Sequence, residues 1–277
     1  MVLHRPEAQL RCHHCGRQER VPPACPECGA AELAPLGHGT QRLEESLRAA
    51  LPEARIARVD RDSTSRRGSL KKVLDQVREG GIDVLLGTQM LAKGHDYPRL
   101  TLVGVLESDG ALFSADFRAA ERLFAQLMQV AGRAGRAQEP GEVLIQTDFP
   151  GHPLYAAVAA HDFDRFASDA LDDRRLAGFP PFSHLALLRA ESKKAGEALD
   201  FLRTAGRLAR KQRAEVEVFD PVPAPLERKA GFERAQLLVR AASRAALQPF
   251  LRAWRAELLA RAERRVRWSL DVDPQEV

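Results

Sequence analysis

The stretch Ile82-Asp83-Val84-Leu85-Leu86-Gly87-Thr88 decides how the middle of this chain folds, because it reads as a buried strand that ends in a glycine and a hydroxyl residue. Short apolar runs of this kind alternate with amphipathic segments between residues 33 and 150. This alternation is typical of a parallel sheet covered by helices. The sequence therefore predicts an α/β fold here, with the chemistry at the carboxyl ends of the strands.

The apolar spacing also predicts the individual elements of this region. Leucines at positions 43, 47 and 51 share one helix face, and a second helix carries apolar residues at positions 70, 73, 74 and 77. A third helix is expected over residues 116–131. The expected strands are residues 33–36, 56–60, 82–86, 100–106 and 142–146.

Composition limits the possible functions. The 277 residues carry a formal net charge of +4 and have a pI near 9.0, a mild basic excess that favours a polyanionic partner. No apolar run of about 18 residues and no signal-peptide pattern occurs, so we expect a cytoplasmic protein without a membrane partner. All four cysteines lie between residues 12 and 28, which excludes a disulfide framework spread over the fold.

Two C-x-x-C-G units, at residues 12–16 and 25–29, have the spacing of a zinc site. Each turn can direct two thiolates at one metal ion, and its glycine permits the tight backbone. A redox function would need one pair at a helix start in a thioredoxin-like unit, and a disulfide conflicts with the expected compartment. The predicted zinc ligands are Cys12, Cys15, Cys25 and Cys28.

The loop after the 82–86 strand is the first candidate site. Thr88 offers a hydroxyl and a backbone N–H to a phosphate, and Gly94 allows a close approach of the backbone to a ligand. Other polar groups suited to contacting a nucleic-acid strand or a nucleotide follow, namely Gln89, Lys93, His95 and Asp96. The alternative is a polar loop that caps a helix. In a second loop, residues 107–118, the phenylalanines belong either to the core or to a movable aromatic element.

The stretch Gln129-Val130-Ala131-Gly132-Arg133-Ala134-Gly135-Arg136 is the second candidate site, a helix end with two arginines three residues apart. A guanidinium binds phosphate in a planar fork and stays charged, so Arg133 and Arg136 suit the charge on a transferred γ-phosphoryl group. Gly132 and Gly135 let the backbone come close. On charge alone, a solvated helix end with cations near its C-terminus explains the same residues.

Together these segments resemble the primosomal protein N′ (PriA) family of bacterial replication-restart helicases. The similar segments are residues 39–41, 86–96, 109–118 and 129–136, and the resemblance runs nearly end to end. It implies the RecA-like second lobe of a helicase that uses ATP to translocate 3′ to 5′ on DNA.

The resemblance also implies roles for individual residues. It places Gln129, Arg133 and Arg136 across a cleft from ATP, with Arg136 as the preferred arginine finger. Contacts to the nucleotide or its phosphates are implied for Gly94, Asp96, Gly132 and Gly135. Contacts to nucleic acid are implied for Thr88, Gln89, Lys93 and His95, with Thr88 also in reach of phosphate.

Two departures from the family pattern limit what this chain does alone. It has no G-x-x-x-x-G-K-[ST] loop and no strand ending in Asp-Glu, so ATP and Mg²⁺ are expected only together with an N-terminal lobe. Residues 1–11 resemble the middle of the family's cysteine-rich region, where four C-x-x-C pairs bind two zinc ions. The two pairs present here either gather on one zinc ion or form two half-sites for another polypeptide.

After residue 151 the pattern changes. A helix over residues 154–176 leads to Phe179-Pro180-Pro181-Phe182, a rigid boundary because two prolines prevent the helix from continuing. The order strand, helix, strand, strand, helix, strand follows, which is typical of a ferredoxin-like α+β domain. Its elements are residues 184–189, 196–211, 215–219, 234–240, 245–263 and 266–272, with a proline-rich turn at 220–225.

The resemblance implies that this C-terminal domain helps to bind branched DNA and the acidic tail of single-stranded-DNA-binding protein. Arg234 and Gln236 align with the partner-contacting strand, although Glu233 and Ala235 replace aromatic residues common in the family. In the last strand, Arg265, Arg267 and Ser269 alternate with apolar residues, so one face is apolar and the other basic.

The resulting hypothesis is the C-terminal half of a replication-restart helicase that binds forked DNA and other primosome proteins. Its expected parts are a partial zinc region at 1–32, a second helicase lobe at 33–150, a helical linker at 151–182 and a C-terminal DNA- and partner-binding domain at 183–277. We expect a monomer. The alternative is a non-catalytic DNA-binding and primosome-assembly scaffold.

Overall fold

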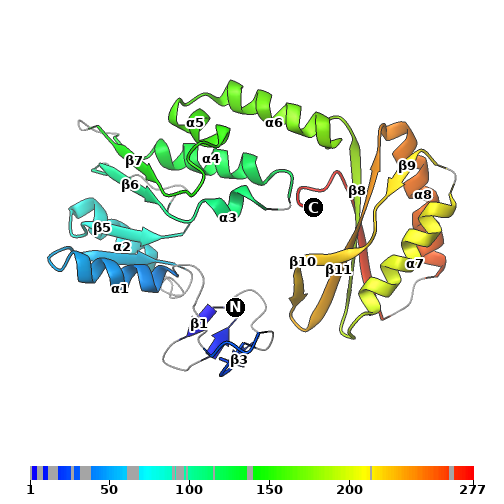
Figure 1. Cartoon of the computed structure of the whole chain (residues 1–277), viewed down its shortest axis with the longest axis horizontal. Coiled ribbons are helices and arrows are strands. Elements are labelled where there is room, and N and C mark those ends of the chain that lie inside the picture. Colours follow the sequence, from blue (N-terminus) through cyan, green and yellow to red (C-terminus); the bar gives the residue numbers. More distant parts are fainter. Residues whose placement is uncertain are drawn as a thin grey trace. The chain divides into compact units, whose positions relative to one another are not determined.

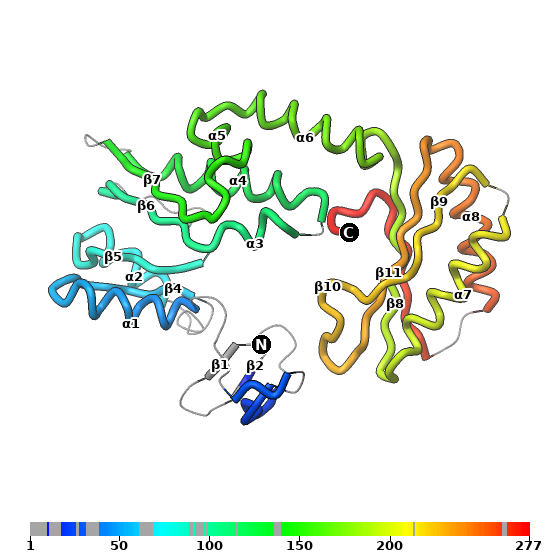
Figure 2. Tube along the Cα trace, in the orientation of Figure 1, coloured from blue at the N-terminus to red at the C-terminus, as the bar shows by residue number. Residues whose placement is uncertain are grey.

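The structure is a computed structural model, and it describes residues 2–4, 9–11, 18–25, 28–31, 39–60, 69–88, 91, 97, 99–114, 116–135, 140–212, 214–261 and 265–277. The chain divides into two compact units, which Figures 1 and 2 trace from the N-terminus to the C-terminus. The parallel-strand unit comprises residues 34–114 and 118–167. The C-terminal unit comprises residues 168–277 together with 1–33 and 115–117.

The first half of the parallel-strand unit contains two helices and two parallel strands. Helix α1 (Thr40–Ala50) leads to β4 (Ile56–Val59), and α2 (Ser69–Glu79) crosses over to β5 (Val84–Gly87). Helix α1 carries Leu43 and Leu47 of the predicted apolar face and ends before Leu51, and α2 carries all four predicted apolar residues. The crossover through α2 puts the carboxyl ends of β4 and β5 at the same edge.

The second half repeats this arrangement. Strand β6 (Leu102–Val105) pairs in parallel with β7 (Glu142–Ile145), and α3 (Asp109–Leu112) and α4 (Ala119–Ala131) connect them. The parallel pairing confirms the α/β prediction in its coarse form. The prediction of one sheet is not met, because the described strands form two separate two-stranded sheets. The strand predicted at residues 33–36 lies outside the described residues.

The single helix predicted over residues 154–176 is wrong. The structure has α5 (Pro153–Ala159) and α6 (Phe163–Ala177), separated by His161 with a left-handed φ of 53°. The Asp162 carboxylate accepts a hydrogen bond from the backbone N–H of Arg165 at 2.9 Å, so it caps the start of α6. The left-handed backbone at His161 therefore separates the two helices, and the Asp162 side chain caps the second.

The C-terminal unit contains a smaller and a larger antiparallel sheet. Strands β1 (Val2–His4), β2 (Gln9–Arg11) and β3 (Gln18–Arg20) form an antiparallel sheet near the N-terminus. The larger sheet belongs to residues 184–272. It has the order β10-β11-β8-β12, and β9 also pairs with β11.

The larger sheet is built from β8 (His184–Ser192), β9 (Val216–Val218), β10 (Val222–Lys229), β11 (Phe232–Ala241) and β12 (Arg267–Val272). All its described pairings are antiparallel. Helix α7 (Glu197–Lys211) connects β8 to β9, and α8 (Arg244–Ala260) connects β11 to β12. In Figure 1 both helices lie on the same side of this sheet.

The proline-rich turn predicted at residues 220–225 is also wrong, because most of it belongs to β10. Strands β9 and β10 pair with different parts of the same edge of β11. Prolines are tolerated at a sheet edge, where a missing N–H breaks no inner ladder bond. Pro223 is thus compatible with the strand in which it lies.

The core of the C-terminal unit lies between this sheet and the two helices. Trp254 of α8 is fully buried, donates a hydrogen bond from Nε1 to the carbonyl of Ala205 in α7 at 2.9 Å, and stacks against Phe250. A Cβ on Gly206 would lie 3.1 Å from the Leu237 side chain, so the glycine lets α7 approach β11 closely. These contacts fix the two helices on one face and leave the other face of the sheet uncovered by them.

Candidate functional site

The first candidate site begins where β5 ends. Thr88 is exposed, and its carbonyl accepts a hydrogen bond from the backbone N–H of Leu91 at 3.0 Å. A Cβ on the preceding Gly87 would lie 2.6 Å from the carbonyl oxygen of Val59, so only glycine permits this close approach to β4. The other residues predicted in this loop lie outside the described residues: Gln89, Lys93, Gly94, His95 and Asp96.

A polar cluster that the sequence reasoning missed lies at the same edge, after β4. Asp60 is only 7% exposed and accepts a hydrogen bond from the Thr40 hydroxyl at 2.8 Å. Arg58 pairs with both Asp60 and Glu44, the latter at 2.8 Å. The cluster therefore fastens the start of α1 to the end of β4. The signal in the sequence was a carboxylate immediately after a strand, but its partner Thr40 is 20 residues away, and Arg58 and Glu44 are 14 residues apart.

The second candidate site follows α4. Gln129 is exposed on the last turn, and Gly132 ends the helix as its C-cap. The backbone N–H of Gly135, which has a φ of 73°, bonds to the carbonyl of Leu100 at 3.1 Å. The helix end is thereby fixed beside the amino-terminal end of β6. Arg136 lies outside the described residues.

Arg133 is half-buried and lies close to Tyr97. Burial raises the pKa of the Tyr97 phenol above its ordinary value, and the positive charge of Arg133 partly offsets this rise. The predicted group Gln129, Gly132, Arg133 and Gly135 is thus brought together on one helix end, whereas Thr88 lies at the end of a different strand pair. The helix end that carries Arg133 is anchored by backbone hydrogen bonds.

A hydrogen-bonded network holds the loop after β6. The Asp109 carboxylate accepts bonds from the Thr147 hydroxyl at 2.5 Å, the Asp148 backbone at 2.8 Å and the Tyr155 hydroxyl at 2.9 Å. Tyr155 also contacts the buried Ser108 hydroxyl at 2.8 Å. These bonds, Thr147 first among them, lower the pKa of Asp109. The network links the carboxyl ends of β6 and β7.

We expect Thr147→Val to raise the pKa of Asp109 towards the ordinary value for aspartate, because it removes the largest stabilising bond to the carboxylate. Tyr155→Phe should raise it less. Since the pKa is depressed in the folded state, the stabilisation exists above the unfolded-state pKa near 4 and is lost as the pH falls below it. NMR titration of the Asp109 carboxyl carbon in the unmodified chain and in the two variants measures these three pKa values. Equal midpoints in all three would contradict the expected order.

The phenylalanines of the second loop have different environments. Phe113 is 61% exposed and makes an edge contact with Phe149, with ring centroids 4.7 Å apart. Phe117 stacks on Phe179 at 4.8 Å, and the Arg174 guanidinium lies over the same ring at 4.9 Å. Neither ring belongs to the buried core, so the core alternative is not supported for this pair.

The described part of the cysteine region contains one tight turn. The N–H of Gly29 bonds to the carbonyl of Cys25 at 2.9 Å, and Gly29 has a left-handed φ of 74°. Cys25 and Cys28 both lie in this turn, which fits the spacing of a metal-binding pair. Cys12 and Cys15 lie outside the described residues. No group of three or more metal-binding side chains occurs among the residues that the structure describes.

In the C-terminal unit, Arg234 and Gln236 lie on β11 and face Glu191 and Arg189 of β8 across the sheet. Their predicted contact with a partner protein stays a prediction. Among the described helices, none combines the length and the apolar composition needed to cross a bilayer.

Three family models match this chain. The "Primosomal protein N C-terminal domain" matches residues 175–275, the "Helicase conserved C-terminal domain" matches residues 37–138, and the "PriA DNA helicase Cys-rich region (CRR) domain" matches residues 1–20. The helicase model thus covers both candidate sites of the parallel-strand unit up to Gln138.

Three curated relatives of this chain share one name. The chain is 45% identical over 278 residues to "Replication restart protein PriA" of Haemophilus influenzae, covering 100% of this chain and 38% of that protein. Proteins of the same name are 42% identical in Treponema pallidum, over 100% of this chain and 42% of that protein, and 41% identical in Bacillus subtilis, over 87% and 30%. The chain therefore spans less than half the length of these relatives.

Proposed function

Because this chain belongs to the PriA family of replication restart proteins, we propose that it forms the C-terminal part of an ATP-dependent 3′ to 5′ DNA helicase. In this proposal the complete protein binds stalled or branched forks and starts primosome assembly. The observation that carries it is the anchored helix end after α4 that bears Arg133, which lies inside the region that matches the helicase model.

In the proposed motor, the helix end after α4 faces a nucleotide held by another lobe. Arg136 acts as the arginine finger, Arg133 supports it from its position beside Tyr97, and Gln129 extends from the exposed side of the last turn. Guanidinium groups suit this role because they neutralise charge that develops on the γ-phosphoryl group. The sequence lacks a phosphate-binding loop, so this chain supplies only one side of the nucleotide site.

The fold that accompanies this function is a RecA-like second lobe followed by a ferredoxin-like domain. The two parallel strand pairs with crossover helices support the first assignment. The order β12-β8-β11-β9 and the position of α7 and α8 on one side support the second. The proposed boundaries are 1–32, 33–150, 151–182 and 183–277, with forked DNA, single-stranded-DNA-binding protein and other primosome proteins as partners.

Zinc is the proposed metal of the cysteine region. The tight turn at Cys25, Cys28 and Gly29 supports a metal-binding pair, and Cys12 with Cys15 would supply the second pair. A bound zinc ion would hold these two turns together. We expect metal analysis to find about one zinc ion per chain, and Cys25→Ser to reduce it sharply. A chain purified under reducing conditions without any metal would contradict this proposal.

A chimaera tests the helicase proposal directly. In it, this chain replaces the matching segment of the Haemophilus influenzae relative, which supplies the rest of the protein. We expect the chimaera to hydrolyse ATP when DNA is added, whereas this chain alone should bind DNA without hydrolysis. A folded chimaera that binds DNA but never hydrolyses ATP would instead favour the non-catalytic scaffold.

A further inference from the structure

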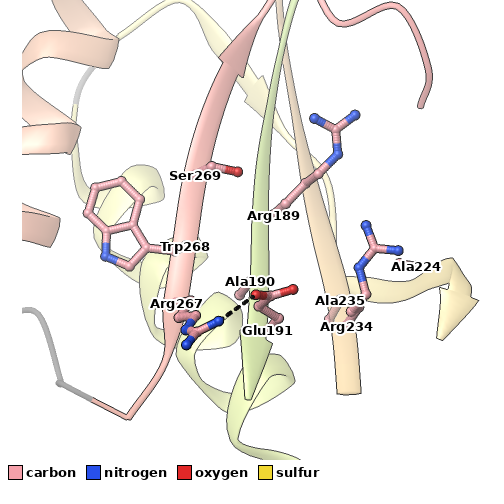
Figure 3. Close-up of a pocket in the computed structure, with 9 residues that line it drawn as sticks. All are labelled: Arg189, Ala190, Glu191, Ala224, Arg234, Ala235, Arg267, Trp268 and Ser269. Carbon is pink, nitrogen blue, oxygen red and sulfur yellow. Dashed lines mark ion pairs between the residues drawn. The ribbon is translucent and has the colours of Figure 1, made fainter. Parts of the chain in front are cut away.

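Three of the arginines on the face of the larger sheet that α7 and α8 do not cover line one hollow. On β8, β11 and β12 the side chains that pack against the helices alternate with side chains that point away from them. Arg189, Arg234 and Arg267 belong to the second set, one on each strand. They line one shallow hollow of about 240 Å³, shown in Figure 3.

The strand register places these arginines in two neighbouring rows of the sheet, with Arg189 diagonal to both of the others. Arg267, Glu191 and Arg234 face one another across β12, β8 and β11, and two residues further along the same strands stand Ser269, Arg189 and Gln236. Diagonal neighbours on one sheet face are about 7–8 Å apart, within reach of long side chains. The three guanidinium groups therefore form a bent line of positive charge, with Glu191 as the carboxylate between its two ends.

A large bulge in the edge strand opens the sheet beside Arg234. Pro223 of β10 pairs with Ala235, but the next registered pair is Arg228 with Glu233. Between these two pairs, β10 has residues 224–227, whereas β11 has only Arg234. Bulges often occur next to functional sites, where they redirect a side chain or end the pairing. Within the part of the chain that the structure describes, the Arg234 guanidinium has no ion-pair partner.

The other two arginines are held in place and keep free donors. Arg189 pairs with Asp271 at 2.7 Å and donates to the carbonyl of Glu276 at 2.8 Å, which uses two of its five N–H donors. Arg267 lies 4.8 Å above the Phe232 ring and only 3.8 Å from Glu191. Both are thus oriented before any ligand arrives.

We infer that this hollow binds the sugar-phosphate backbone of single-stranded DNA, with Arg234 as its principal contact. The inference deepens the proposed function and rests on it, because it names the surface of the C-terminal unit that holds DNA. Forked guanidinium donors match phosphate oxygens, and a line of cations can follow successive phosphates of one strand.

The lining argues against an acidic peptide with large apolar side chains as the occupant. Apart from the arginines and Trp268, the hollow is lined by small or polar residues, including Ala190, Ala224 and Ala235. The Trp268 ring points away from the three arginines in Figure 3 and packs against the core. Phe232 is engaged by Arg267 and by Lys193, whose Nζ lies 5.6 Å from the ring. The hollow thus offers charge without an apolar slot.

Binding of a fluorescein-labelled oligothymidylate of about 20 nucleotides to the full chain, followed by anisotropy at several salt concentrations, tests this inference. Arg234→Gln should weaken binding about tenfold at low salt and reduce the salt slope by about 0.7, because one phosphate contact is lost. Arg234→Gln with Arg267→Gln should lose more. Arg203→Gln, which removes an exposed arginine from the helix side, should leave both values unchanged.

The outcomes separate this inference from the proposed function. If the unmodified chain binds the oligonucleotide but Arg234→Gln binds it with the same affinity and slope, the inference is wrong and the proposed function stands. If the unmodified chain binds no DNA, both fail. An aspartate-rich peptide is the second probe. Loss of peptide binding in Arg234→Gln with unchanged DNA binding would also overturn the inference. Arg234→Gln breaks no ion pair of the described residues, so circular dichroism should show an intact fold.

Discussion

Arg136→Ala in the chimaera is expected to lower DNA-stimulated ATP hydrolysis by about 10³-fold or more, the range associated with an arginine finger. The reason is that a guanidinium neutralises charge on the γ-phosphoryl group in the transition state. The methyl side chain of alanine cannot neutralise this charge. DNA affinity should change little, because the proposed DNA contacts lie on other residues. Steady-state phosphate release at saturating DNA measures the first quantity, and anisotropy measures the second.

Two control variants sharpen this prediction. Arg136→Lys keeps the charge but not the planar fork, so it should restore only a small part of the activity. Arg165→Ala removes an exposed arginine from α6 and should leave hydrolysis unchanged. If Arg136→Ala hydrolyses ATP at the rate of the unmodified chimaera, Arg136 is not the finger. A loss of DNA affinity as large as the loss of turnover would show that the residue serves DNA binding instead.

Local patterns predicted most of the elements correctly. The helix α2 follows from apolar residues at helical spacing, and β12 follows from the alternation of apolar and polar residues around Trp268. These features depend on residues close in the sequence. The break between α5 and α6 was missed because it depends on the left-handed backbone of His161 and the cap at Asp162, which an apolar repeat does not reveal.

In the candidate sites, too, sequence patterns did not reveal contacts between residues far apart in the chain. The sequence singled out Arg133 and Thr88, and the structure places Arg133 beside Tyr97 and Thr88 at the end of β5. It could not show that Asp60 would be buried against Thr40, because that contact requires the end of β4 to meet the start of α1. Likewise, the pair between Arg189 and Asp271 joins residues 82 positions apart, which only the strand register brings together.

Trp254→Ala is expected to lower the free energy of unfolding of the C-terminal unit by about 3–5 kcal/mol, the usual cost of deleting a large aromatic side chain from a core. Trp254 is 0% exposed, so the change leaves a cavity between α7, α8 and the sheet. The variant also loses the bond from Nε1 to the carbonyl of Ala205 and the contact with Phe250.

Trp254→Phe separates these contributions, since it keeps most of the ring volume but removes the donor, and should cost about 1–2 kcal/mol. Leu176→Ala changes a side chain that is 87% exposed and should cost close to nothing. The second of the two tryptophans, Trp268, packs against the same core and stays in every variant as a fluorescence probe for urea unfolding. If Trp254→Ala unfolds at the same urea concentration as Leu176→Ala, the indole does not hold α8 on the sheet. The position of the sheet that carries the three arginines would then have to depend on contacts other than the packing of Trp254.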